Sequence, residues 1–220
     1  RVVASECAAL GADRGGRAQS RAAPLAPLRP LLQAVADRCS EHGAEALERL
    51  LGERAPLLAT YEPAIGRLPG VAAMAPPPVL SVEGTRARLF HTLRETVRAL
   101  ADEGPLVLLI DDVQWADELT LRFLDSLGPD YFATVGLLVL ATHRSEEPHP
   151  IVDELRARPD AIVLDVGELG GEDVRAMVGD MLALRELPRP LFERLAVQAG
   201  GVPFHVGEYL RAAVEDGLLT

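Results

Sequence analysis

The chain has 220 residues, of which 48% are hydrophobic and 25% are charged, as is typical of a globular protein with one substantial domain or a domain and a small appendage. Its formal net charge of −11 disfavours a general nucleic-acid-binding surface, so no direct binding of nucleic acid by this segment is expected. Cys7 and Cys39 lack metal-ligand spacing, and no apolar run reaches the roughly 18 residues of a membrane helix, so we expect a cytoplasmic protein without a membrane span.

The first third of the chain predicts a strand followed by helices. Residues 1–5 are predicted as the end of a strand, and a Gly/Arg/Ala-rich loop follows at 11–23. After the proline-rich stretch 24–30 begins, apolar side chains recur at helical spacing, namely Leu28, Leu31, Leu32 and Val35. We expect another helix near residues 44–51 and an extended connector at Pro76–Pro78.

Helical and strand patterns alternate in the middle of the chain. Thr85 is predicted to cap a helix with a single apolar stripe, which consists of Leu89, Phe90, Leu93, Val97 and Leu100. Short apolar runs predict three buried strands, at 106–110, 136–142 and 161–166. Asp117 is predicted to cap a helix between the first two of these strands, and a short helix is expected within 148–158. Strands that alternate with helices predict an α/β fold with a parallel sheet.

The last part of the chain has only helical patterns. After Gly170–Gly171 the apolar residues indicate three helices, at 174–184, 191–198 and 204–214. We therefore predict a small helical unit that begins near residue 169, after the α/β part has ended.

Two adjacent carboxylates follow the first of the three apolar runs. The run Leu106–Ile110 ends in Asp111 and Asp112. Ligands of open α/β sheets bind beyond the carboxyl ends of the strands. Mg²⁺ typically binds one or two carboxylates together with substrate phosphates and water molecules. The sequence therefore predicts that these acids hold a hydrated Mg²⁺ and orient a water molecule, unless one of them caps a turn.

Lysine is absent from the chain, because all 22 residues counted as Lys or Arg are arginines. A phosphate-binding P-loop has the pattern Gly-x-x-x-x-Gly-Lys-Ser/Thr, in which the lysine contacts the β- and γ-phosphates. Gly11, Gly15 and Gly16 do not have this spacing, and Arg17 does not replace a lysine there. The 220 residues therefore contain no P-loop of this kind.

Further motifs surround the paired acids. Residues 106–117 read LVLLIDDVQWAD, residues 138–144 read LVLATHR, and 201–204 are Gly-Val-Pro-Phe at the start of a predicted helix. Together with the Pro-Leu stretch at 24–30, these segments resemble the nucleotide-binding module of STAND-type ATPases, a branch of the AAA-like P-loop ATPases. Such modules occur in bacterial LuxR-type regulators, multidomain Ser/Thr kinases and adenylate cyclases. In this resemblance, residues 106–117 correspond to the Walker B strand, 138–144 to the sensor-1 strand and 201–204 to the lid.

The resemblance covers nearly the whole chain and implies a fold. We expect a P-loop NTPase-like parallel sheet with helices on both faces, in which 1–168 form a truncated ATPase core and 169–220 a helical lid. The family's first strand and P-loop would precede Arg1 and are missing here. That strand would lie between those that end at Thr142 and near Asp165. We therefore expect that the chain alone does not bind ATP tightly or turn it over.

The resemblance also implies roles for individual residues. Asp111 would be the carboxylate of the Mg²⁺ ion, and Asp112 would polarise the attacking water as general base. Arg144, at the carboxyl end of a strand, would sense the γ-phosphate of ATP. Thr142 would contribute a hydroxyl group to the same site.

Some of these assignments have ordinary alternatives. Arg144 has Glu146 and Glu147 nearby in the sequence, and a surface ion pair with either would contribute little. Pro203 resembles the lid proline that packs on the adenine, and it is also suited to the first turn of a helix. Trp115 is expected to pack against the loop after the first acidic strand rather than to contact a ligand.

The implied function is that of a regulatory switch in a multidomain signal-transduction ATPase. ATP or ADP with Mg²⁺ would connect the sheet edge and the lid, and the partners would be kinase, cyclase or DNA-binding output domains, helical repeats and possible further copies of the chain. The alternative is a nucleotide-independent scaffold that retains the ATPase fold. A phosphoacceptor receiver domain needs a lysine, and a haloacid-type phosphatase needs an aspartate at Val113, so the sequence excludes both.

Overall fold

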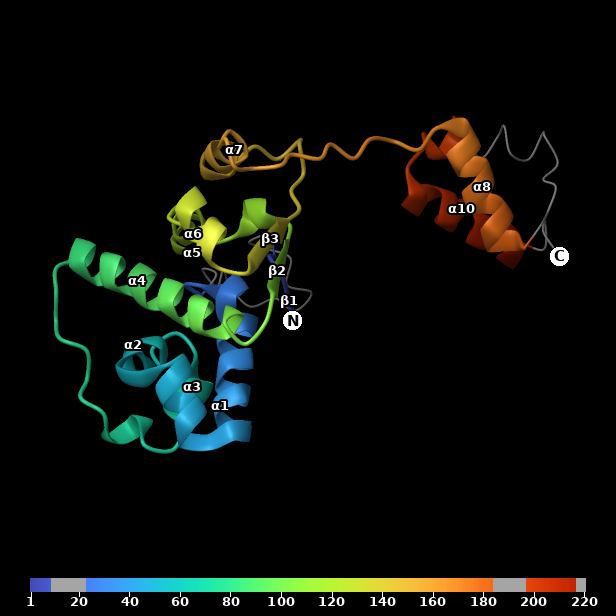
Figure 1. Cartoon of the computed structure of the whole chain (residues 1–220). Coiled ribbons are helices and arrows are strands. Elements are labelled where there is room, and N and C mark those ends of the chain that lie inside the picture. The colour runs from blue at the N-terminus through green and yellow to red at the C-terminus, as the bar shows by residue number, and fades with distance from the viewer. Residues whose placement is uncertain (9–22, 184–196, 217–220) are drawn as a thin grey trace, which may run out of the picture. The chain divides into compact units, whose positions relative to one another are not determined.

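The computed structural model describes residues 1–8, 23–183 and 197–216. The chain divides into two compact units, Arg1–Ile162 and Val163–Thr220, and each is described by itself (Figure 1). The sequence predicts that 1–168 form an ATPase core and 169–220 a lid. Two compact units do not by themselves show these roles, so the assignment stays a prediction.

A parallel sheet forms the centre of the first unit. Its strands have the spatial order β1-β2-β3, with bounds Val2–Glu6 (β1), Leu106–Asp111 (β2) and Leu137–Ala141 (β3). The register places Glu6 opposite Asp111, and Ile110 opposite Ala141, so the carboxyl ends of the three strands meet at one edge. The sheet and the helices around it confirm the predicted parallel α/β fold of the P-loop NTPase type.

Helices connect the strands of the first unit (Figure 1). The α-helices are α1 (Arg29–Leu50), α2 (Ala55–Leu58), α3 (Pro63–Gly66), α4 (Val82–Ala101), α5 (Glu118–Asp125), α6 (Pro129–Thr134) and α7 (Pro150–Arg156). Short 3₁₀ turns occur at Ala26–Leu28, Gly52–Arg54, Val71–Ala73 and Val113–Trp115. The helices expected near 28–35 and 44–51 are parts of α1, which is kinked at Gly43, where φ is 72°. None of the described helices combines the length and the apolar character needed to cross a membrane.

One face of the sheet is buried and the other is exposed. Successive side chains of a strand point to opposite faces, and on β2 the residues of one face belong to the main core, namely Leu106, Leu108 and Ile110. The opposite face carries Val2, Leu138 and Leu140, with exposed fractions of 68%, 58% and 47%. The described helices of the first unit leave this second face uncovered, and helices over it stay a prediction.

Helix α4 begins earlier than predicted. Ser81, and not Thr85, is its N-cap, and the Ser81 Oγ accepts a hydrogen bond from the amide of Gly84 at 3.1 Å. The apolar stripe that marks the helix in the sequence starts only at Leu89, because the residues of the first two turns are mostly exposed. The stripe therefore indicated the helix but not its first residue.

The strand predicted at 161–166 is not formed. Its apolar side chains are largely exposed, with 89% for Ile162, 78% for Leu164 and 96% for Val166. Branched apolar residues favour a strand only where a neighbouring strand and a buried face are available, and no described strand pairs with this segment. The expectation of a further strand between β3 and this segment remains untested.

The regular elements described in the second unit are helices, and residues 163–170 before them form no helix or strand. Its helices are α8 (Gly171–Leu182) and α10 (Pro203–Glu215), which correspond to two of the three predicted helices. Most of the third, predicted at 191–198, lies outside the described residues, and 197–199 are helical. The small core of this unit contains Val174, Val178, Ala199, Val206 and Leu210.

Candidate functional site

The candidate site begins where β2 and β3 end. β2 ends at Asp111, and the chain turns sharply at Asp112. Backbone hydrogen bonds continue beyond the strands, because the amide of Thr142 donates to the carbonyl of Ile110 at 3.0 Å and the amide of Val113 donates to the carbonyl of Thr142 at 2.9 Å. The residues that follow the two strands are therefore held next to each other.

Asp112 has a left-handed backbone conformation, with φ 54° and ψ 47°. Such a conformation costs a non-glycine residue on the order of 1–3 kcal/mol, although Asp tolerates it better than most residues. Thr142 supports the turn, since its Oγ1 accepts a hydrogen bond from the amide of Asp112 at 3.0 Å. The same hydroxyl donates to Oδ1 of Asp111. One threonine side chain thus joins the two acidic residues.

Arg144 contacts the side chain of Asp112. Its Nε donates to Oδ1 of Asp112 at 3.1 Å, and Nη2 lies 3.5 Å from Oδ2. The amide nitrogen Nε2 of Gln114 donates to the same Oδ1 at 3.0 Å. Burial by itself raises the pKa of Asp112, but the hydrogen bonds from Gln114 and Arg144 and the charge of Arg144 outweigh it, so the pKa lies below its ordinary value. Asp112 is therefore held in its charged form.

The structure brings four of the predicted site residues together, Asp111, Asp112, Thr142 and Arg144. Their roles toward a ligand remain predictions. Pro203 lies in the other unit, where it is exposed and occupies the first turn of α10, as its alternative assignment expects.

Three side chains of the cluster were not predicted as site residues: Gln114, Trp115 and Glu147. The indole Nε1 of Trp115 donates to Oε2 of Glu147 at 2.5 Å, and the Arg144 guanidinium lies 4.8 Å from the centroid of the Trp115 ring. The ion pair of Arg144 with Glu147, expected as an alternative, is long at 4.0 Å and secondary to the contact with Asp112. The tryptophan and the acid are 32 positions apart, so no local pattern marks their contact.

The oxygen atoms at this edge suit a magnesium ion. Asp111 is exposed, and among the described hydrogen bonds only its Oδ1 is engaged, by the Thr142 hydroxyl. Carboxylate and hydroxyl oxygens are hard ligands of the type that Mg²⁺ prefers, with water and phosphate oxygens completing its coordination. The described residues contain no group of three or more His, Cys, Asp or Glu side chains that could hold a metal by themselves. The residues therefore fit an ion that a bound phosphate also helps to hold.

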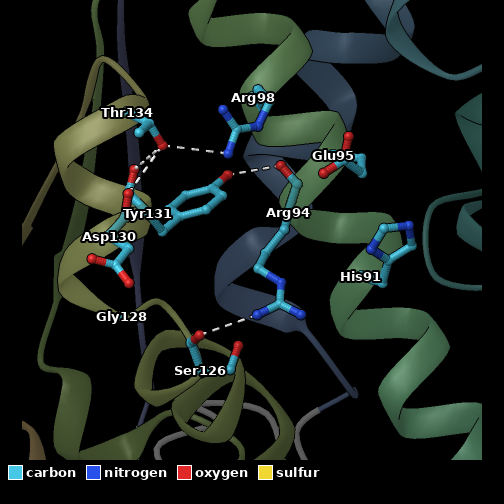
Figure 2. Close-up of a pocket in the computed structure, with 9 residues that line it drawn as sticks. All are labelled: His91, Arg94, Glu95, Arg98, Ser126, Gly128, Asp130, Tyr131 and Thr134. Atoms are coloured by element: carbon cyan, nitrogen blue, oxygen red, sulfur yellow. Dashed lines mark hydrogen bonds between the residues drawn. The ribbon is translucent and has the colours of Figure 1, made fainter.

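A separate cavity of about 600 Å³ lies between α4 and α6. Figure 2 shows its arginines directed at neighbouring protein groups. Arg94 donates to the carbonyl of Ser126 at the end of α5, at 3.3 Å, and the Arg98 guanidinium lies 5.4 Å from the centroid of the Tyr131 ring. These contacts join helices, so the cavity is explained by packing, and none of its lining residues belongs to the sheet-edge cluster.

Comparison with known proteins identifies the family. Residues 1–140, more than half of the chain, match the AAA ATPase domain. No curated protein and no solved structure matches the chain. The matched residues include β1, β2 and nearly all of β3, so the paired acids lie within the matched region. The chain therefore belongs to the family of AAA ATPase domains, which are nucleotide-binding modules that use ATP, typically with Mg²⁺.

Proposed function

We propose that this chain is part of a STAND-type regulatory ATPase and that the sheet-edge cluster is its nucleotide site. The observation that carries the proposal is the convergence of Asp111, Asp112, Thr142 and Arg144 at the carboxyl ends of β2 and β3. In open α/β sheets this edge is where ligands bind. The match of residues 1–140, which include Asp111 and Asp112, to the AAA ATPase domain supports a nucleotide as the ligand.

Each residue of the cluster has a separate role in this proposal. Asp111 and the Thr142 hydroxyl would hold Mg²⁺, which supplies charge neutralisation for the β- and γ-phosphates when it is bound. Asp112 accepts the proton of the attacking water as general base. Arg144 donates hydrogen bonds to the γ-phosphate oxygens. The sequence resemblance supports the roles of Asp111, Asp112 and Arg144, whereas the place of Thr142 beside the ion is supported by its hydrogen bond to Oδ1 of Asp111.

The regulatory role is a further part of the proposal. Pro203, in the first turn of α10, would contact the adenine, so that the helical second unit responds to the bound nucleotide. The nucleotide state would then bias an output domain of the same cytoplasmic protein, such as a kinase, cyclase or DNA-binding domain, through a hinge-type change. Helical repeats or further copies of the chain are the other partners proposed.

We also infer that these 220 residues do not turn over ATP efficiently by themselves. They contain no lysine, and the β- and γ-phosphates of P-loop ATPases are held by a lysine of the loop. Arg144 alone supplies fewer phosphate contacts than a P-loop does. Weak binding and slow turnover are the expected result.

Calorimetry with Mg–ATP tests the proposal. It compares this chain with a chain extended upstream of Arg1 in its parent sequence, and each carries Asp111→Ala in a parallel sample. We expect tighter binding by the extended chain, and weaker Mg²⁺-dependent binding after Asp111→Ala. Asp37→Ala, which removes an exposed carboxylate of α1, is the matched control and should leave binding unchanged. Failure of both folded chains to bind would favour the nucleotide-independent scaffold.

A further inference from the structure

Arg144 is contacted on several sides in the described structure. Asp112 accepts hydrogen bonds from its guanidinium, and the ring of Trp115 lies against the same group, 4.8 Å from ring centroid to Cζ. Its backbone amide donates to Oε1 of Gln114 at 3.3 Å. An exposed arginine that pairs only with one acid is free to adopt many rotamers, whereas these contacts restrict both its backbone and its side chain.

Trp115 is itself fixed by Glu147. The indole N–H donates to Oε2 of Glu147 at 2.5 Å, a charge-assisted hydrogen bond. The other carboxylate oxygen of Glu147 lies 4.0 Å from Nη1 of Arg144. Glu147 therefore orients the aromatic ring on which the guanidinium rests. A cation over an aromatic face is attracted by the ring, and it stays there only if the ring is held in place.

We propose that Trp115 and Glu147 are positioning residues that hold Arg144 across Asp112, and that Asp112 is masked until Arg144 moves. This proposal rests on the proposed function for its consequence, because a phosphate group at the sheet edge would compete with Asp112 for the guanidinium. Movement of Arg144 onto the phosphate would free the Asp112 carboxylate to accept a proton from water. The nucleotide would thus unmask the general base that acts on it.

The first test needs no nucleotide. The pKa of Asp112 is measured by carbon-13 NMR of the aspartate carboxyl groups in the 220-residue chain. Arg144 is the charged group that acts on this carboxylate in the described structure. Asp111, Asp117 and Glu6 lie around Cys7 at the same edge, and Cys7 is an uncharged thiol because burial and then these carboxylates raise its pKa to about 11.

Glu147→Ala gives opposite results for the two roles that this acid could have. Removing a negative charge lowers the pKa of Asp112 if Glu147 acts only through its charge. Losing the anchor of Trp115 raises the pKa if Glu147 positions Arg144. We expect an upward shift, together with a smaller shift or none after Glu147→Gln, which keeps an oxygen acceptor for the indole N–H. Trp115→Ala should also shift the pKa upward, toward the value in Arg144→Ala.

Glu154→Ala is the matched control for Glu147→Ala. Glu154 also pairs with an arginine, Arg122, at 3.0 Å, and this pair is separate from the hydrogen bonds and ion pairs described around Arg144. Its removal should leave the pKa of Asp112 unchanged. An Asp112 pKa that stays at or below the wild-type value after Glu147→Ala, or that does not change after Trp115→Ala, would overturn the positioning role.

The second test follows the movement of Arg144. Trp115 is the single tryptophan of the chain, so its fluorescence reports the guanidinium that lies on its ring. In protein that binds Mg–ATP by calorimetry, saturation should change the Trp115 emission and increase its quenching by acrylamide, and Arg144→Ala should remove this response. Binding without a fluorescence change would overturn the unmasking step. Absence of binding both by this chain and by the extended chain would instead contradict the proposed function, and the NMR series would still decide whether Trp115 and Glu147 position Arg144.

Discussion

Tyr131 is a buried residue that joins two helices by a single hydrogen bond. Tyr131 lies on α6, and its hydroxyl donates to the carbonyl of Arg94 on α4 at 2.7 Å (Figure 2). Tyr131→Phe keeps the ring and removes the donor. We expect a loss of about 0.5–1.5 kcal/mol in the free energy of unfolding, measured by urea denaturation at neutral pH, because a typical buried hydrogen bond contributes this much.

The contribution of Tyr131 should also depend on pH. Burial raises its pKa to about 12, above the value of about 10 for an unfolded chain. A group whose pKa is higher in the folded state contributes fully below the unfolded pKa, and the contribution is lost as the pH rises through the folded pKa. The difference in stability between wild type and Tyr131→Phe should therefore shrink between about pH 10 and 12. Cys7 and Cys39, with pKa values raised to about 11, are present in both proteins and cancel. A difference that stays constant over this range would contradict the prediction.

The charged residues of the candidate site were predictable for a simple reason. Asp111 and Asp112 interrupt an apolar run at a strand end, and Arg144 follows the next strand, so the parallel register brings them to one edge. The contact between Trp115 and Glu147 was not predictable, because it depends on the path of the loop after β3. The left-handed backbone of Asp112 was not predictable either, since Asp adopts it only occasionally.

Gly201 precedes helix α10 and is a position where only glycine fits. Its φ is 72°, and a Cβ atom there would lie 2.6 Å from the carbonyl oxygen of Leu169 and 2.9 Å from Cβ of Glu168. The amide of Leu169 also donates to the carbonyl of Gly201 at 2.8 Å, so the two segments cannot separate without losing this bond. We expect Gly201→Ala to destabilise the second unit, observed as faster amide hydrogen exchange in α8 and α10.

Gly200 provides the matched control for this prediction. It has nearly the same backbone conformation, with φ at 57°, but a Cβ atom there would meet no described atom within 4 Å. Gly200→Ala therefore costs only the left-handed conformation, roughly 1–2 kcal/mol, whereas Gly201→Ala adds a steric clash with the backbone. Equal exchange rates in the two variants would show that the close approach at Gly201 is not important.

The elements of the fold differ in how well the sequence predicts them. β2 and β3 were predicted within one or two residues, because continuous apolar runs bounded by breakers are typical of parallel strands. The two predicted parts of α1 meet at Gly43, whose φ of 72° is not helical, so this glycine forms the kink between them because it adopts a left-handed backbone at little cost. The segment 161–166 has the composition of a strand but no described partner, and hydrogen bonding to a partner is not a local property.

The first unit is stabilised by a large core and by Glu103, a glutamate that pairs with three arginines. Its core extends from β1 to α7, and Glu103, which follows α4, pairs with Arg38 at 2.9 Å, with Arg1 at 3.6 Å and with Arg49. Burial raises the pKa of Glu103, but the hydrogen bonds from Arg49 and Arg38 outweigh it, and the pKa lies below its ordinary value. The acid thus connects the start of β1 to α1 and to the loop before β2.

The second unit should unfold before the first. Its described core contains five buried residues, whereas the core of the first unit has buried residues from β1, β2 and its helices. A small core leaves little free energy after the entropy of ordering the chain is subtracted. We expect amide hydrogen exchange, measured by mass spectrometry, to be faster in α8 and α10 than in α4 and β2.

Leu210→Ala, which removes a buried side chain at a cost of about 2–5 kcal/mol, should abolish protection in α8 and α10 and leave α4 protected. Leu93→Ala, the same change in α4, should lower protection throughout the first unit. If Leu210→Ala lowered protection equally in both units, they would unfold as one cooperative structure, and the prediction would be wrong.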